Sequence, residues 1–249
     1  MEWHDEGIVL GVRKHGETAA IVSLLTREHG RHMGLVRGGQ SRRRQGFLQP
    51  GNLVSAAWRA RLAEHLGTFT LEAGRDFAAG VLDDGLRLKA LSSLTALLET
   101  TLAEQDPQPE IYILSLAMIE RLAGTDGAAG DDPPLAWLAD YVRWELDLLR
   151  GIGFGLDLGT CAATGGTEEL IYVSPRSGRA VSAAAGAPWR EKLLGLPAFL
   201  ADPGVPAAAL AEIADGLRLT GHFLKRHQFS AESHRSPAAR ERLVSALEF

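Results

Sequence analysis

The hydrophobic residues of this chain change their spacing near residue 80, and this change constrains the fold more than any other feature of the sequence. Before that point, short segments rich in apolar residues are separated by turns that contain glycine. After it, leucines recur at steps of three and four, as at Leu88, Leu91 and Leu94. Alternation is typical of strands, whereas steps of three and four are typical of helices. The sequence therefore predicts a β module followed by an α module.

The β module has the strand number and spacing of a small barrel. Five short strands with regular turn signals favour a closed barrel over a sandwich. The longest connection, between the third and fourth strands, is basic, and this is the usual design of an OB-fold. We expect the strands at residues 6–12, 19–25, 31–36, 53–60 and 67–72.

The α module is expected to occupy the rest of the chain. Apolar stripes predict long helices over 88–102, 111–122 and 135–149, the last ending at a basic turn and Gly151. Further helices are expected over 210–224 and 243–247, and the Gly-, Ala- and Asp-rich segment 124–134 predicts a mobile loop. The fold class is thus α+β and multidomain, with an OB-fold domain at 1–80 and an all-α helical domain at 81–249.

The charge of the chain is divided between these modules. The net charge is −5, but residues 1–79 contain 11 Lys and Arg against 8 Asp and Glu, a net charge of +3. The remaining residues contain 15 against 23, a net charge of −8. A basic module joined to an acidic one suggests that the first contacts phosphates and the second contacts proteins.

The positive charge of the β module is concentrated between the third and fourth strands. Segment 36–51 places four arginines within eight residues, between paired glycines and a Pro-Gly turn. We interpret it as a flexible loop that follows a phosphate backbone, because guanidinium groups pair with phosphate oxygens and glycines let the main chain approach. The alternative is a solvated turn that keeps the barrel soluble.

The sequence shows no sign of catalysis or of a membrane span. It lacks the phosphate-binding, metalloprotease and nucleophile-elbow motifs, and its eight histidines are scattered. His29 and His32 flank a turn, where we expect them to be solvated or to contact phosphate. Cys161, the single cysteine, fits a reducing cytoplasm and is expected to be a buried small residue. We predict a cytoplasmic binding protein with no cofactor.

Residues 155–190 fit neither module. Two pairs of positions, Cys161 with Thr164 and Ser182 with Ala185, each close on a glycine and have the spacing of a four-cysteine zinc ribbon. Only one of the four places holds sulfur, so we predict no metal. The residues between the pairs predict a β-hairpin around 175–178. The alternative is that this spacing arises by chance in a segment rich in small residues.

Several motifs in order along the chain resemble the RecO family of bacterial recombination mediators. Each motif is short, but together they span most of the chain in the expected order. The motifs lie at residues 6–10, 16–18, Leu25 to Gly30, Gly38-Gly39 with the arginine cluster that follows, 48–50, 144–158, Cys161, 174–178 and 221–226.

The resemblance implies a DNA repair and recombination function in the RecF pathway, without enzymatic activity. It implies binding of single- and double-stranded DNA and annealing of complementary strands. It also implies partnership with RecR and with the C-terminal tail of single-strand-binding protein, which together help RecA to load, in the nucleoid. Many members have an inserted zinc ribbon, and this chain departs from them at three of four ligand places. The insertion at about 155–190 is therefore expected to persist as a degenerate, metal-free ribbon.

The candidate DNA-binding residues lie in the β module. We expect phosphate contacts from the segment's arginines, hydrogen bonds from Gln40 and Ser41, and an extended basic track on the first and fourth strands. Strand alternation predicts Arg59 and Arg61 on one face and Trp58 in the core. The candidates are Arg37, Gln40, Ser41, Arg42, Arg43, Arg44, Arg13, Lys14, Arg59 and Arg61.

The candidate partner-binding residues lie in the helical domain. An acidic, amphipathic tail needs an apolar groove bordered by a cation, and Arg121, Arg143 and Arg150 are candidates. They are equally compatible with ordinary surface positions. Lys225 and Arg226 are expected either to contact DNA or to cap their helix.

Two other functions remain compatible with the sequence. One is a scaffold whose OB barrel docks partner proteins, with the arginines serving solubility. The other is an RNA-binding OB protein without annealing activity. Salt dependence of binding separates the first from DNA binding, and competition between DNA and RNA separates the second.

Overall fold

The computed structural model describes residues 1–249 except 63, 125–133, 203, 230–235 and 248–249. The chain divides into two compact units, one of residues 1–129 and 237–243, the other of residues 130–236 and 244–249. The expected domain boundary at residue 80 stays a prediction. The loop expected at 124–134 lies, apart from its two end residues, outside the described residues.

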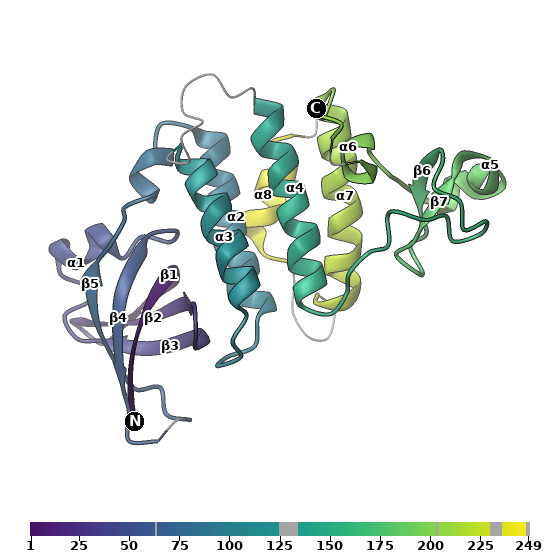
Figure 1. Ribbon diagram of the computed structural model, residues 1–249. Coiled ribbons are helices and arrows are strands. Elements are labelled where there is room, and N and C mark those ends of the chain that lie inside the picture. Colours follow the sequence, from purple (N-terminus) through teal and green to yellow (C-terminus); the bar gives the residue numbers. More distant parts are fainter. Residues whose placement is uncertain (63, 125–133, 203, 230–235, 248–249) are drawn as a thin grey trace. The chain divides into compact units, whose positions relative to one another are not determined.

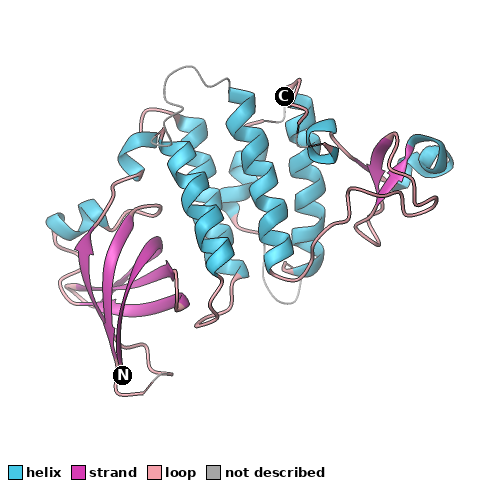
Figure 2. Ribbon diagram, in the orientation of Figure 1, coloured by secondary structure: helices cyan, strands magenta, loops and turns pink. Residues whose placement is uncertain are grey.

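The first unit begins with a closed β-barrel (Figure 1 and Figure 2). Its strands are ordered β1-β2-β3-β5-β4, and β4 pairs back to β1. This order agrees with an OB-fold, so the expected fold class is confirmed. Strands β2 to β5 lie within one residue of their expected bounds, whereas β1 extends beyond both. The bounds are β1 Glu2–His15, β2 Ala19–Thr26, β3 Gly30–Val36, β4 Leu53–Arg59 and β5 Thr68–Ala73.

The barrel closes around apolar side chains from its inward-facing positions. Val22, Leu24, Trp58 and Phe69 are among the residues of this core. A Cβ atom added at Gly34 would lie 2.4 Å from the Phe69 ring, so the absence of a side chain there makes room for phenylalanine. The burial of Trp58, which is 2% exposed, confirms its expected place in the core.

Helices follow the barrel within the same unit. They are η1 Ala78–Val81, α2 Gly85–Thr101 and α3 Pro109–Ala123, joined by the first residues of α8 Ala238–Ser245. The Asp84 side chain caps α2 by accepting hydrogen bonds from the amides of Leu86 and Arg87. Arg13 of β1 pairs with Glu99 of α2 at 3.1 Å.

The second unit is built on two long helices, α4 Pro134–Gly151 and α7 Leu210–His227. Gly216 lets them approach, since a Cβ atom there would lie 2.9 Å from Val142. The short helix α6 Ala198–Ala201 adds Phe199 to this contact. The helices expected from the sequence are present, and no helix among the described residues is long and apolar enough to cross a membrane.

A small β structure is inserted between α4 and α7 (Figure 1). Strand β6 Leu170–Val173 pairs with β7 Ala180–Ser182 and with β8 Leu194–Gly195. The expected hairpin around 175–178 is therefore present. The helices α5 Ala183–Gly186 and η2 Ala187–Lys192 complete this insertion, which we call the ribbon (residues 157–195).

Candidate nucleic-acid interface

The arginine-rich segment is not the flexible loop that the sequence predicts. Residues Arg42–Phe47 form the short helix α1. Ser41 precedes it in an extended conformation, and its carbonyl accepts hydrogen bonds from the amides of Arg44 and Gln45, both at 2.9 Å. The flanking glycines predict a loop, but arginine itself has a high helix propensity. The buried side chain of Leu48 ends the helix against the core.

Helical geometry distributes the three consecutive arginines over different directions, because successive residues are about 100° apart. Arg44 is partly buried and lines a hollow on the barrel, whereas Arg42 and Arg43 are exposed outside its lining. Arg37, which directly follows β3, also lines this hollow. The segment therefore presents arginines on more than one face of α1.

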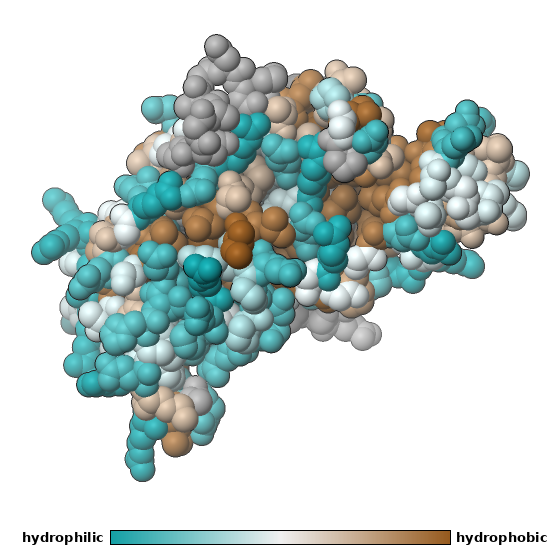
Figure 3. All heavy atoms as spheres, viewed as in Figure 1, coloured by the Kyte–Doolittle hydropathy of each residue, from teal (hydrophilic) through white to brown (hydrophobic). Residues whose placement is uncertain are grey.

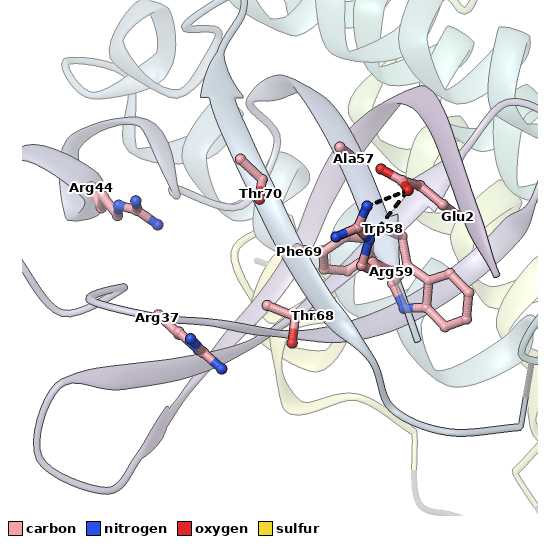
Figure 4. Close-up of a pocket in the computed structure, with 9 residues that line it drawn as sticks. All are labelled: Glu2, Arg37, Arg44, Ala57, Trp58, Arg59, Thr68, Phe69 and Thr70. Carbon is pink, nitrogen blue, oxygen red and sulfur yellow. Dashed lines mark hydrogen bonds and ion pairs between the residues drawn. The ribbon is translucent and has the colours of Figure 1, made fainter. Parts of the chain in front are cut away.

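The hollow has a volume of about 500 Å³ and lies on strands β4 and β5. Figure 4 shows Arg37 and Arg44 on one side of β5 and Arg59 on the other, where Glu2 binds it. The polar walls of the hollow include Thr68 and Thr70. The complete lining is Glu2, Arg37, Arg44, Ala57, Trp58, Arg59, Thr68, Phe69 and Thr70. We call this feature the arginine hollow.

The arginines of this segment differ from most others in lacking carboxylate partners. Among the described residues, Arg37, Arg42, Arg43 and Arg44 form no ion pair. Elsewhere arginines are neutralised locally, with Asp140, Asp147 and Asp215 each pairing with an arginine one turn further along the same helix. Unpaired guanidinium groups remain available for an external anion. The barrel's visible surface is mainly hydrophilic (Figure 3).

Gln40 and Ser41 have different roles in the structure. The Gln40 side chain donates a hydrogen bond to the Ala19 carbonyl at 2.9 Å, and the backbone N–H of Gln40 donates to the Thr18 carbonyl. These bonds fasten the segment to the start of β2. The Ser41 side chain makes no capping bond to α1 and is exposed. Of the two predicted donors, Ser41 is the one that the structure leaves open to solvent.

The predicted extension of the basic track is only partly brought together. Arg13 is paired with Glu99, and Lys14 is exposed near the end of β1. Arg59 lines the arginine hollow, but Arg61 does not share a strand face with it, because β4 ends at Arg59. The prediction for Arg61 was wrong in geometry, since strand alternation does not continue beyond the end of the strand.

Arg59 is held by the first residues of the chain. Glu2 and Arg59 are direct partners in the β1–β4 register. One oxygen, Oε2 of Glu2, accepts hydrogen bonds from Nη2 of Arg59 at 2.7 Å and from Nε at 3.2 Å. This pairing lowers the pKa of Glu2, so the carboxyl is ionised at neutral pH. Glu2 was not predicted as a site residue, because β1 begins four residues earlier than expected.

The two histidines at the β2–β3 turn were also interpreted wrongly. His32 is 4% exposed, and burial lowers its pKa, which favours the neutral ring. His29 stacks on Trp3, with ring centroids 4.2 Å apart, and its Nδ1 lies 3.1 Å from Asp5. These rings form an aromatic cluster with Trp58 and Phe69 rather than a solvated pair.

The second unit has a separate pocket of about 300 Å³ whose lining combines apolar and charged side chains. Arg143 and Arg150 border it, paired with Asp140 at 2.9 Å and Asp147 at 2.7 Å. The third predicted arginine, Arg121, belongs to α3 in the first unit and does not line this pocket. We call it the leucine pocket; its remaining lining is Leu146, Asp147, Leu156, Leu158, Phe199 and Leu200.

The ribbon keeps part of the backbone pattern of a metal site. Cys161 is 1% exposed, and its sulfur accepts a hydrogen bond from the Ser182 amide at 3.3 Å. Hydrogen bonds from Thr164 and Ser182 lower the pKa of the Cys161 thiol from 9.0 to about 6, against desolvation, which raises it. Cys161, Thr164 and Ser182, three of the four positions with zinc-ribbon spacing, are thus linked by hydrogen bonds.

The residues at these positions do not fit zinc. A structural zinc site is built from four thiolate or imidazole ligands, whereas this cluster offers one thiol and two hydroxyls. Among the described residues, no group of three or more His, Cys, Asp and Glu side chains lies close enough to hold a metal ion. The ribbon is held instead by hydrogen bonds, including those of Asp157 with Thr160 and Arg179.

Comparison with known proteins agrees with this architecture. Two family models match, "Recombination protein O N terminal" over residues 1–73 and "Recombination protein O C terminal" over residues 82–235. The chain is 51% identical to the "DNA repair protein RecO" of Rhodospirillum rubrum, over 99% of this chain and 96% of that protein.

Other relatives with the same name align over almost the same length. The protein of Rhodospirillum centenum is 52% identical, over 98% of this chain and 94% of its own length. That of Mesorhizobium japonicum is 49% identical, over 99% and 94%. The two matched regions coincide with the barrel and with the helices and ribbon. This chain belongs to the RecO family.

Proposed function

We propose that this protein is a non-enzymatic mediator of DNA repair and recombination that binds single- and double-stranded DNA and anneals complementary strands. Together with RecR, it helps RecA to load onto DNA coated with single-strand-binding protein, in the cytoplasm and at the nucleoid. Family membership supports the DNA repair function. The arginine hollow supports the contact with DNA.

The observation that carries the proposal is the set of unpaired arginines at the hollow and on α1. Arg37 and Arg44 enter the hollow, and Arg42 and Arg43 extend the charge over the exposed surface of α1. A polyanion gains the most from cations that have no competing carboxylate. Most of the barrel's aromatic rings lie in its core, so phosphate contacts dominate and sequence selectivity is low.

Annealing follows from the same charge distribution. Two complementary strands repel each other through their phosphates, and a dense cationic surface lowers that repulsion while the bases pair. Arginines spread around α1 approach strands from more than one direction, whereas arginines on one face would hold a single backbone. This function requires no bond making or breaking by the protein.

The leucine pocket is our candidate for the tail of single-strand-binding protein. It offers Leu146, Leu156 and Phe199 to apolar side chains. A carboxylate of the tail would compete with Asp140 and Asp147 for Arg143 and Arg150 at the border of the pocket. The Arg143 guanidinium lies 5.4 Å from the centre of the Phe199 ring and donates to the Phe199 carbonyl. This fixes a cation beside the apolar surface, which is the chemistry that an acidic, amphipathic tail requires.

The proposal is tested by annealing of complementary oligonucleotides, bare and coated with single-strand-binding protein. The variant R42Q/R43Q/R44Q should lose most DNA affinity in fluorescence anisotropy and most annealing, with little change in melting temperature. The control R75Q/R218Q removes charge from arginines that are paired with carboxylates and lie outside the arginine hollow and the ribbon. It should retain binding. Equal binding by the first variant and the wild type would refute the site.

The two alternatives give different results in the same system. For a phosphate binder, log affinity falls with log salt by about 0.7 per neutralised phosphate on single strands. A scaffold whose arginines serve solubility lacks this steep dependence on salt, and an RNA-binding protein is displaced from DNA by RNA of the same sequence. Intact DNA binding without acceleration of annealing would favour the scaffold.

A further inference from the structure

The ribbon exposes a tryptophan that nothing in the proposed barrel interface explains. Trp189 is 59% exposed, whereas Trp58, Trp137 and Trp144 are at most 4% exposed. Tryptophan is enriched at interfaces, because its ring combines a large apolar face with a polar N–H group. Trp189 is therefore the aromatic residue whose exposure most requires a functional account.

The helix η2 places cations around this ring. In a 3₁₀-helix, residues three apart lie on the same face, so Trp189 and Lys192 share a face of η2. The Lys192 ammonium lies 5.7 Å from the centre of the indole ring. Arg190 and Glu191 are both exposed and lie on the other two faces of η2, so the carboxylate does not share the face of Trp189 and Lys192.

These cations are not neutralised by the ribbon itself. Across the described part of the chain, neither Arg190 nor Lys192 forms an ion pair. Arg179, on the same ribbon, is paired with Asp157 at 3.2 Å. The ribbon thus has one arginine that stabilises its fold and two free cations beside an exposed indole.

We infer that Trp189, Lys192 and Arg190 form a second contact for single-stranded DNA, in which a base stacks on the indole and the cations bind adjacent phosphates. This rests on the proposed DNA binding of the protein and assigns a second strand contact to the ribbon. An exposed aromatic face beside free cations is the combination that holds single strands without sequence preference. A protein partner would be expected to need a broader apolar surface than one ring.

A second strand contact would also give the metal-free ribbon a function. Annealing brings two strands together, and a protein with a second strand contact outside the barrel can hold both. The ribbon's hydrogen-bonded cluster at Cys161 holds the hairpin, and η2 follows that hairpin after the short helix α5. The module then contributes a DNA contact instead of a metal site.

The test is a titration of the full-length protein with a thymidine oligonucleotide of about 30 nucleotides, roughly twice the largest site size of one OB-fold. Binding should quench the intrinsic fluorescence, and W189F should remove most of the quench while retaining most of the affinity. W189A should weaken binding about tenfold, since stacking contributes about 1–3 kcal/mol per base. The control I171A changes another exposed apolar residue of the ribbon and should bind normally.

The charges are tested separately. R190Q/K192Q should reduce the dependence of log affinity on log salt by about 1.4, from two phosphate contacts on a single strand. E191Q, on another face of η2, should not reduce it. If W189A and R190Q/K192Q bind as the wild type does while R42Q/R43Q/R44Q is defective, the inference fails and the proposed function stands. If the wild type does not bind the oligonucleotide, both fail.

Discussion

The barrel and the ribbon are two small β structures of one chain, and they are held together by different means. The barrel closes a continuous sheet around an apolar core that includes Trp58 and Phe69. The ribbon has short strands and a polar centre, where Cys161 is hydrogen-bonded to Ser182 and Thr164. The first is stabilised mainly by burial of apolar surface, whereas the second combines a few buried apolar residues, such as Val173 and Ala180, with hydrogen bonds around Cys161.

The two structures also present their cations differently. The barrel concentrates its free arginines on α1 and at the arginine hollow, with little exposed aromatic surface. The ribbon combines fewer cations with the exposed ring of Trp189. For a single strand of nucleic acid, free arginines suit phosphates and an exposed ring suits bases, so under our two proposals the barrel and the ribbon make complementary contacts.

The largest effect on this comparison is expected from truncation in the barrel core. F69A should lower the free energy of unfolding by about 3–5 kcal/mol, because it leaves a cavity beside Gly34 that the closed barrel cannot fill. The neighbouring T70A, at an exposed position of the same strand, is the matched control. Chemical denaturation followed by circular dichroism measures both. Equal stability of the two variants would show that the barrel is not held by its core.

A smaller effect is expected when the ribbon is given the ligands of a zinc site. T164C/S182C/A185C should bind one zinc ion per chain, and cobalt substitution should give the visible spectrum of tetrahedral thiolate coordination. Metal at one hundred times its dissociation constant would stabilise the ribbon by about 2.7 kcal/mol. The wild type should neither bind zinc nor respond to a chelator. Failure of the variant to bind metal would mean that position 185 does not face Cys161.

The barrel and the ribbon also differ in how far the sequence predicts them. Alternating apolar residues locate β2 to β5 within one residue, because one face of each strand must be buried. The spacing of Cys161, Thr164 and Ser182 matches that of a zinc ribbon, and the structure brings these residues together. The spacing alone left chance open as an alternative, so this part of the ribbon was less predictable than the strands of the barrel.

What the sequence does not predict depends on pairing between distant segments. Glu2 meets Arg59 only because β1 begins before the apolar run and pairs with β4. The helix α1 forms where the sequence predicts a loop. The exposure of Trp189 was likewise not predicted from the sequence. Side-chain partners decide which arginines are free, and those partners come from elements far apart in the chain.

The polar centre of the ribbon can be tested by titration of its thiol. S182A removes one hydrogen-bond donor from the Cys161 sulfur, so its pKa should rise from about 6 toward 9.0. Because the folded pKa is depressed, the thiolate's contribution to stability is complete above pH 9, declines below it and is lost as pH falls through about 6. S182A should narrow the pH range over which this contribution to stability changes, because the folded pKa moves closer to the unfolded value. Thiolate absorbance against pH measures the shift, with S177A in the hairpin turn as control; an unchanged pKa would contradict the assigned cause.

The smallest effect concerns the one carboxylate in the arginine hollow. Glu2 holds the Arg59 fork where a phosphate would bind, and both side chains are largely open to solvent, 46% and 75% exposed. E2Q should raise affinity for single-stranded DNA about threefold, because exposed ion pairs are weak and solvent screens them. It should also steepen the dependence of log affinity on log salt by about 0.7, since Arg59 then neutralises one more phosphate.

A double-mutant cycle decides whether Glu2 acts through Arg59. In the R59Q background, E2Q should lose the change in salt dependence, because no guanidinium remains to be released. A gain of affinity that persists in that background would mean that Glu2 only contributes general repulsion of the phosphates. In that case Arg59 belongs to the β1–β4 pairing, and Arg37 and Arg44 alone define the cationic side of the hollow.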